Sequence, residues 1–246
     1  MSYDFKSQRL FLDQPLQAGL EVEVERAQAH YLTNVLRMRT GDALLVFNGR
    51  DGEWQARIAW NGKKSCRLEI VRQTRDQPPR PALHYLFSPL KQARLDYMVQ
   101  KAVEMGAGRL SPVLTQFTQV SRVNPERMRA NAIEAAEQCG VLSIPDIDAA
   151  EKLDAVLAGW PADKALVFCD EGAAGGGTLD SLAEIGDRPA AVLIGPEGGF
   201  SEPERQHLKS LAFVTPVSLG PRILRADTAA VAALALVQAV IGDWRD

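Results

Sequence analysis

The 246-residue sequence has little cysteine and no long apolar run. Its three cysteines, Cys66, Cys139 and Cys169, are odd in number and widely spaced, which excludes a disulfide framework and a C-x-x-C metal pattern. The longest apolar stretch, residues 228–241, is shorter than a bilayer span and is interrupted by Gln238. The first residues lack the apolar segment and the cleavage site of a signal peptide. From these absences we expect a soluble cytoplasmic protein with no membrane span and no metal site.

The net charge of −3 conceals an uneven distribution of charge along the chain. Residues 1–129 carry 20 Lys and Arg against 13 Asp and Glu, a net charge of +7, whereas residues 130–246 carry 8 against 18, a net charge of −10. The basic first half favours a polyanionic partner for that half. The alternative is chance clustering of solvated surface charge, and charge alone does not identify the partner.

The first 73 residues are typical of a small β-barrel domain with one helix. Short alternating apolar segments are separated by Gly, Asn and Asp clusters. Asn61-Gly62, between two such segments, predicts a two-residue hairpin turn. Residues 73–81 contain three prolines and three charged residues, a composition typical of a linker. The predicted strands are residues 20–24, 43–47, 54–60 and 66–71, and the predicted helix is residues 27–38.

From residue 74 to residue 246 the pattern changes to strands that alternate with helices. Such alternation predicts a second, α/β domain with a mainly parallel sheet and helices on both of its faces. The predicted strands are residues 82–87, 109–114, 164–169, 190–194 and 213–218. The predicted helices are residues 91–105, 125–139, 179–185, 202–211 and 226–241.

The first segment that carries chemistry is residues 191–204, where an apolar strand enters a turn with three glycines. Ser201 and Glu204 then fit a capping box that starts a helix. Glycines at the carboxyl end of a parallel strand let backbone groups approach a ligand closely. The segment lacks the G-x-G-x-x-G spacing of a dinucleotide site and the Lys of a P-loop. A tight structural turn is the alternative interpretation.

The second such segment is residues 217–229, where another strand ends in a Gly-Pro turn and enters a helix. Asp227 in the first turn of that helix suits the positive end of the helix dipole. Arg222 and Arg225 lie in an otherwise apolar stretch, where charges are costly unless paired or used. They are either functional or surface residues that flank a turn. Because neighbouring strand ends can line one pocket, we expect the two loops to act together.

Together the two loops resemble the 16S ribosomal RNA uridine-N3 methyltransferase family of the SPOUT class, and the resemblance extends over nearly the whole chain. It implies a PUA-like β-barrel at the N-terminus, an α/β domain with a trefoil knot, S-adenosylmethionine as cofactor, 16S rRNA of the small subunit as substrate and a homodimer. The apolar helix at residues 226–241 suits that dimer, although a monomer would bury it equally well. The matching segments include residues 30–42, 91–106, Pro112, residues 134–139 and Pro145.

The resemblance also implies roles for particular residues. The cofactor-binding residues would be Ile194, Gly195, Pro196, Glu197, Gly198, Gly199, Leu219, Gly220, Pro221, Arg222, Ile223 and Leu224, with Cys169, Asp170 and Glu171 as a third wall. Arg225 would contact the target nucleotide and steady negative charge on the uracil ring. Asp227 would orient Arg225 or help to remove the proton. The RNA-binding residues would be Arg37, Arg39, Lys91, Arg94 and Lys101.

Three positions depart from the family's pattern: Phe117 and Val141 stand where arginines are usual, and Asp227 replaces a usual Glu. The lost arginines imply weaker phosphate contacts.

Two other classes of function stay open. One is a non-catalytic RNA-binding assembly factor, and the other is an enzyme that binds a phosphate with the loop at residues 195–199. A methyltransferase that acts on another RNA nucleotide is the third alternative.

Overall fold

The computed structural model describes residues 4, 6–62, 65–172 and 177–245, which form two compact units. The first unit contains residues 1–80 together with residues 136–144, and the second contains residues 81–135 and 145–246. The chain therefore returns to the first unit at the end of helix α3 (Pro125–Cys139). Within the first unit, Glu137 accepts a hydrogen bond from the Phe11 N–H at 2.8 Å.

The first unit is built on a five-stranded sheet with the order β1-β3-β4-β5-β2. The strands are β1 (Arg9–Phe11), β2 (Glu21–Glu23), β3 (Ala43–Phe47), β4 (Glu53–Trp60) and β5 (Cys66–Arg75). β1 pairs with β3 in parallel and the other pairs are antiparallel. Alternate residues point into one apolar core, among them Val46, Ile58 and Leu68.

Two local predictions for this unit are wrong. β4 and β5 are joined by residues 61–65, and the Asn61 N–H donates to the Ser65 carbonyl at 2.8 Å, so the loop is longer than the predicted two-residue turn. Residues 63–64 lie outside the described residues. The predicted linker is also shorter, because β5 continues to Arg75. The Arg75 guanidinium and the Thr74 hydroxyl both bind Glu53 of β4, which extends the strand pair.

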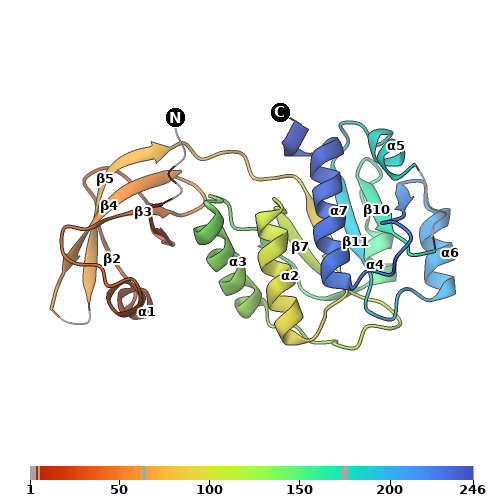
Figure 1. The fold of residues 1–246 in the computed structure, drawn as a ribbon, viewed down its shortest axis with the longest axis horizontal. Helices are drawn as coiled ribbons and strands as arrows, with labels where there is room; N and C mark the ends of the chain where they lie inside the picture. Colours follow the sequence, from red (N-terminus) through yellow and green to blue (C-terminus); the bar gives the residue numbers. More distant parts are fainter. Residues whose placement is uncertain (1–3, 5, 63–64, 173–176, 246) are drawn as a thin grey trace. The chain divides into compact units, whose positions relative to one another are not determined.

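The predicted helix over residues 27–38 is present but shorter. It consists of α1 (Arg26–His30) and a π-helical turn, η1 (Tyr31–Val35). Arg37 adopts a left-handed conformation with φ of 55°, which no helix continues through. α1 lies beside the sheet (Figure 1), and Ala29 and Leu32 contribute to the core.

The second unit contains a seven-stranded parallel sheet with the order β12-β10-β11-β6-β7-β8, in which β9 also pairs with β7. The strands are β6 (His84–Phe87), β7 (Arg109–Leu114), β8 (Asp146–Ile147), β9 (Glu151–Lys152), β10 (Ala165–Cys169), β11 (Ala190–Ile194) and β12 (Val214–Val217). The helices are α2 (Gln92–Glu104), the part of α3 up to residue 135, α4 (Leu153–Ala158), α5 (Thr178–Ala183), α6 (Glu202–Ser210), α7 (Ala226–Ile241) and a 3-10 turn, η2 (Asp243–Arg245).

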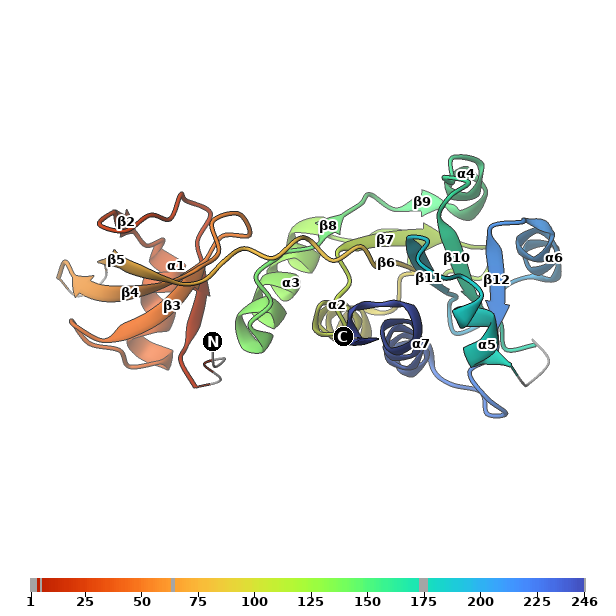
Figure 2. The same ribbon diagram turned by 90° about the horizontal axis from the view of Figure 1, so that it is seen from above.

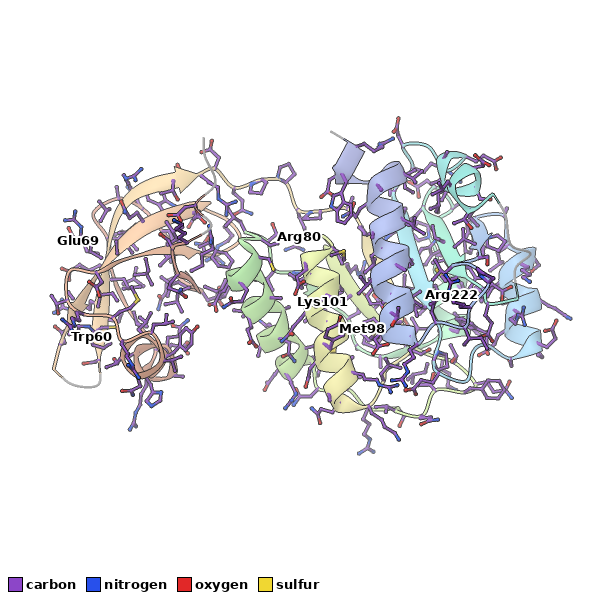
Figure 3. All side chains as sticks on the ribbon, viewed as in Figure 1. Trp60, Glu69, Arg80, Met98, Lys101 and Arg222 are labelled. Atoms are coloured by element: carbon purple, nitrogen blue, oxygen red, sulfur yellow. The ribbon has the colours of Figure 1, made fainter. Side chains whose placement is uncertain are left out.

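Helices cover both faces of this sheet, as predicted. Figure 2 shows α4 on one side of the strands and α2 with α7 on the other. Phe168 and Leu193 pack in one cluster with Leu157 of α4. On the other face, the Tyr85 hydroxyl donates to the sulfur of Met98, whose place on α2 is labelled in Figure 3. Each central strand is therefore buried on both sides, which explains its continuous apolar sequence.

Helix α7 packs against α2, α5 and β11. Its residues Ala226, Ala230, Ala233, Leu234 and Val237 are buried within this chain. Among the described helices, none combines the length and the apolar character of a membrane span.

Candidate functional site

Three loops that follow three neighbouring strands line a single cavity of about 210 Å³ in the second unit. The strands β12, β10 and β11 are adjacent and parallel, so their carboxyl ends meet at the same edge of the sheet. This edge is where open α/β sheets bind ligands. The sheet order therefore brings together segments that are far apart in the sequence.

The cavity contains most of the residues that the sequence predicted for cofactor binding. Gly198 and Pro221 are the exceptions, since neither lines it. Of the predicted set, the lining includes Ile194, Gly195, Pro196, Glu197, Gly199, Leu219, Gly220, Arg222, Ile223 and Leu224, with Cys169, Asp170, Glu171 and Arg225. Sequence reasoning missed Phe200, Arg205, Ala226 and Ala229, which also line it. Phe200 directly follows the glycine run, and that adjacency is the signal that could have found it.

The loop after β11 requires glycine at two positions that line the cavity. A Cβ at Gly195 would lie 2.5 Å from the ring of Phe200, which packs edge-on against Phe168 at 5.0 Å. Gly199 has φ of 70°, and a Cβ there would lie 2.8 Å from a carboxylate oxygen of Glu171. Glycine therefore lets the backbone of this loop form the cavity wall where side chains would clash.

The predicted capping box at the start of α6 is present. The Ser201 side chain accepts from the Glu204 N–H, and the Glu204 carboxylate accepts from the Ser201 N–H at 2.9 Å. The other oxygen of Glu204 accepts from the Gln116 N–H at 2.8 Å. Glu204 thus fixes the end of the glycine loop and also holds the turn that follows β7.

Asp170, which directly follows β10, is a buried charged residue that lines the cavity. Its buried carboxylate pairs with Arg205 at 2.9 Å and with Lys209 at 2.7 Å, both from α6. Burial alone would raise the pKa of Asp170, but the bonds and charges from Lys209, Gly172 and Arg205 outweigh it and keep the pKa below its ordinary value. The carboxylate is therefore ionised, and it ties the β10 loop to α6.

Cys169 lines the cavity without the properties of a nucleophile. Burial raises the pKa of its thiol to about 12. The thiolate is the reactive form of cysteine, so the group remains a neutral wall residue at physiological pH.

The loop between β12 and α7 carries both arginines that the sequence singled out. Arg222, labelled in Figure 3, and Arg225 are exposed and line the cavity, and Ile223 between them is 89% exposed. Arg225 is the N-cap residue of α7, and Asp227 lies in its first turn. Asp227 accepts from the Thr228 N–H at 2.9 Å, and the described residues contain no ion pair between Arg225 and Asp227. The structure therefore gives no support to Asp227 as the residue that orients Arg225.

The predicted RNA-binding residues lie in different surroundings. Arg37 and Arg39 are both exposed and follow η1, because the helix predicted over residues 27–38 ends before either of them. Lys91 is the exposed N-cap residue of α2. Arg94 pairs with Glu197 of the glycine loop at 2.5 Å, and Lys101 (Figure 3) pairs with Glu104 at 2.7 Å. No cluster of three or more His, Cys, Asp or Glu that could hold a metal ion occurs in the described part of the chain.

Comparisons with known proteins assign the two units to two family models. A model described as an RNA methyltransferase domain matches residues 77–238, and one described as an RNA methyltransferase PUA domain matches residues 24–71. The ribosomal RNA small subunit methyltransferase E of Rickettsia conorii is 29% identical and covers 95% of this chain and 96% of its own length. The protein of the same name from Bacillus subtilis is 27% identical over 94% of this chain and 95% of its own length.

Solved structures give the same assignment. The ribosomal RNA small subunit methyltransferase E of Neisseria gonorrhoeae, bound to S-adenosyl methionine, matches with a TM-score of 0.86 and 27% identity over 97% of this chain and 99% of that one. A putative methyltransferase of Legionella pneumophila in complex with the same cofactor matches with a TM-score of 0.83 and 29% identity over 95% and 98%. The chain therefore belongs to the RNA methyltransferase family, with a PUA domain in its first unit and the methyltransferase domain, which carries the three-loop cavity, in its second.

Proposed function

We propose that this protein transfers a methyl group from S-adenosylmethionine to N3 of a uridine in the 16S rRNA of the small ribosomal subunit. One observation carries the proposal. In a member of the RNA methyltransferase family, three strand-end loops, one of which requires glycine at two positions, line one cavity beside two exposed arginines. The names of the full-length relatives support ribosomal RNA of the small subunit as the substrate.

The cavity residues fit the cofactor. Apolar side chains such as Ile194 and Leu224 offer contacts for a purine base. The glycine backbone at Gly195, Gly199 and Gly220 leaves room for close approach of polar groups. Acidic side chains, Glu171 and Glu197 among them, suit a ligand that carries a sulfonium and an ammonium group. When bound, S-adenosylmethionine supplies the electrophilic methyl group.

The residues of this chain then have to hold the uracil ring and steady its charge. N3 of uridine is a weakly acidic imide nitrogen, so it must leave its base pair and lose its proton to become nucleophilic. Arg225 at the cavity wall stabilises the negative charge that develops on the ring. For the N3 proton we assign Asp227 as the acceptor, because it is a carboxylate in the first turn of α7 with no arginine partner among the described residues. Asp227 does not itself line the cavity, so the uracil has to approach that turn.

The remaining contacts concern the RNA and a second copy of the chain. The residues that bind phosphates of the substrate are Arg37 and Arg39 of the PUA domain and Lys91 of α2. Arg94 and Lys101 also bind phosphates when they exchange their carboxylate partners for the RNA.

The partly exposed apolar residues of α7, such as Val231, Leu236 and Val240, form part of a homodimer interface. Light scattering on the purified protein measures the dimer directly.

The experiment that tests this function uses small ribosomal subunits from a strain that lacks the enzyme. Labelled S-adenosylmethionine provides the methyl group, and reverse transcription maps the product, because a methyl group on N3 blocks the pairing edge. We expect a new stop at one uridine near the 3′ end of the 16S rRNA. Incorporation into another RNA would overturn the target but keep the methyltransferase. An absence of both incorporation and cofactor binding would indicate a non-catalytic assembly factor.

A further inference from the structure

The turn after β7 is held rigidly next to the glycine loop. The Thr118 N–H donates to the Thr115 carbonyl at 3.1 Å, and the Thr115 N–H donates to the Thr118 hydroxyl at 2.8 Å. The Gln116 N–H between them donates to Glu204, the third residue of α6 and a member of its capping box. This turn, residues 115–118, is therefore fixed to the helix that begins where the glycine loop ends.

Phe117 is the side chain that this turn presents. A Cβ built on Gly198 would lie 3.3 Å from the Cβ of Phe117, so the base of the phenylalanine packs on the backbone of the glycine loop. The side chain is nevertheless 44% exposed. The ring carbons Cγ and Cδ2 lie 3.7 and 4.0 Å from the same point, so the Cβ and the near edge of the ring face the glycine loop while the residue remains exposed to solvent.

Gly198 is the one residue of the run 195–199 that does not line the cavity. It faces Phe117 instead, while its neighbours Glu197 and Gly199 line the cavity wall. The ring therefore lies on the outer side of the loop whose inner side forms the cavity. The Arg94–Glu197 ion pair lies next to it along the same loop.

An exposed aromatic ring costs free energy in water, and a rigid one next to a cavity for methyl transfer offers a flat apolar surface. A uridine that enters the cavity has to leave its stack, which also exposes the bases beside it. Stacking on an aromatic side chain compensates for that loss and tolerates any base. The backbone of Gly198 separates the ring from the cavity, so the base that stacks on it is a neighbour of the target.

We propose that Phe117 is a positioning residue that stacks on a base flanking the methylated nucleotide. This proposal rests on the proposed function, because it places the RNA against the glycine loop. Phe117 then contributes to binding of the RNA, and the cavity residues contribute to binding of the cofactor.

The test compares Phe117→Leu, which keeps an apolar contact with Gly198, with Phe117→Trp, which keeps an aromatic face. We expect Phe117→Leu to raise KM for small subunits about 5-fold to 100-fold, the range of one base–aromatic stack. Its kcat and its Kd for S-adenosylmethionine stay at the wild-type values, and Phe117→Trp restores KM. Trp244→Leu removes another exposed aromatic side chain and serves as the matched control.

Three results would overturn the proposal. The first is a wild-type KM in Phe117→Leu, and the second is a defect in Phe117→Trp equal to that of the leucine variant. The third is a parallel change in the Kd for the cofactor, which would assign Phe117 to packing of the loop. Filter binding of 16S rRNA to each variant separates this proposal from the proposed function. Weaker RNA binding by Phe117→Leu supports stacking even if the wild-type protein transfers no methyl group to the subunits.

Discussion

The guanidinium of Arg94 lies 2.5 Å from the carboxylate of Glu197, an ion pair that connects α2 to the glycine loop. The sequence predicted these residues for two different ligands, RNA and cofactor. Their pairing means that a contact of either residue with its ligand affects the other. RNA that attracts Arg94 would release Glu197, and Glu197 lines the cavity.

We predict that this ion pair makes a small contribution to cofactor binding. Both side chains are about one-third exposed (37% and 32%), so the coupling free energy in a double-mutant cycle of Arg94→Ala and Glu197→Ala is about 0.3–1 kcal/mol. The measurement is the Kd for S-adenosylmethionine of the four proteins at two salt concentrations. Asp96 with Arg127, another ion pair of α2, is the matched control and should show no coupling. A coupling of zero for Arg94 and Glu197 would mean that the pair does not hold the loop.

Gly195→Ala should damage the cavity while the fold persists. The added Cβ would meet the ring of Phe200, and overpacking of this kind costs about 1–3 kcal/mol. We expect the Kd for S-adenosylmethionine to rise about 5-fold to 100-fold by calorimetry. Phe200→Leu in the same chain should restore part of the affinity. Gly159→Ala, where the nearest atom would be 3.8 Å away, should bind like the wild type. A normal Kd for Gly195→Ala would contradict the glycine requirement.

The Arg225→Ala variant tests whether Arg225 stabilises the negative charge that develops on the uracil ring. Loss of one donor to a developing anion typically lowers kcat about 100-fold to 1,000-fold. We expect a fall of this size in single-turnover methyl transfer, with the melting temperature unchanged because Arg225 is exposed. Arg188→Ala, outside the cavity lining, is the control. Turnover at the wild-type rate by a folded Arg225→Ala protein would remove Arg225 from the mechanism.

A buried chain of hydrogen bonds at the opposite edge of the sheet sets the response of the second unit to acid. Lys164 donates to Nδ1 of His84 at 2.8 Å, Nε2 of His84 lies 2.6 Å from the Ser111 hydroxyl, and Ser111 bonds Asp148. Arg109, with bonds at 2.8 and 3.0 Å, keeps Asp148 ionised, so its carboxylate accepts from Ser111. Ser111 then accepts from Nε2, and His84 is neutral with its proton on that nitrogen.

This arrangement predicts a loss of stability between pH 6.5 and pH 3. Burial, and then the charges of Lys164 and Arg109, lower the pKa of His84 from 6.5 to about 3. The unfolded chain takes up a proton below pH 6.5 and the folded chain does not, so the stability present above pH 6.5 falls by about 1.4 kcal/mol per pH unit. Urea unfolding should show a flatter pH dependence for His84→Gln than for the wild type. His30→Gln, at an exposed position, should keep the wild-type slope. Equal slopes for His84→Gln and the wild type would refute the neutral state of His84.

Much of the fold could be predicted because long elements carry periodic apolar patterns. Strands β3, β7 and β11 and helices α3 and α7 have the predicted bounds. The two-residue strands β8 and β9 were missed because so few residues show no period, and the three-residue strand β1 for the same reason. The π-helical turn at Tyr31–Val35 also went unpredicted, since its apolar spacing resembles that of an α-helix.

Part of the candidate site could also be predicted from the sequence. Glycines at strand ends identified the loops after β11 and β12, because local backbone requirements appear in the sequence. The role of Gly198 could not be predicted, since its facing Phe117 rather than the cavity depends on a turn 80 residues earlier in the chain. Arg205 likewise lines the cavity only because it pairs with Asp170 on another element.

The most direct test of the central claim identifies the modified nucleoside itself. Small subunits that lack the modification are incubated with the protein and with S-adenosylmethionine that carries a deuterated methyl group, and the 16S rRNA is digested to nucleosides for mass spectrometry. The account predicts one deuterated 3-methyluridine per 16S rRNA, and a smaller yield from Gly195→Ala at a cofactor concentration near the wild-type Kd. A deuterated methyl group on another base, on a ribose or on another atom of uracil would contradict it.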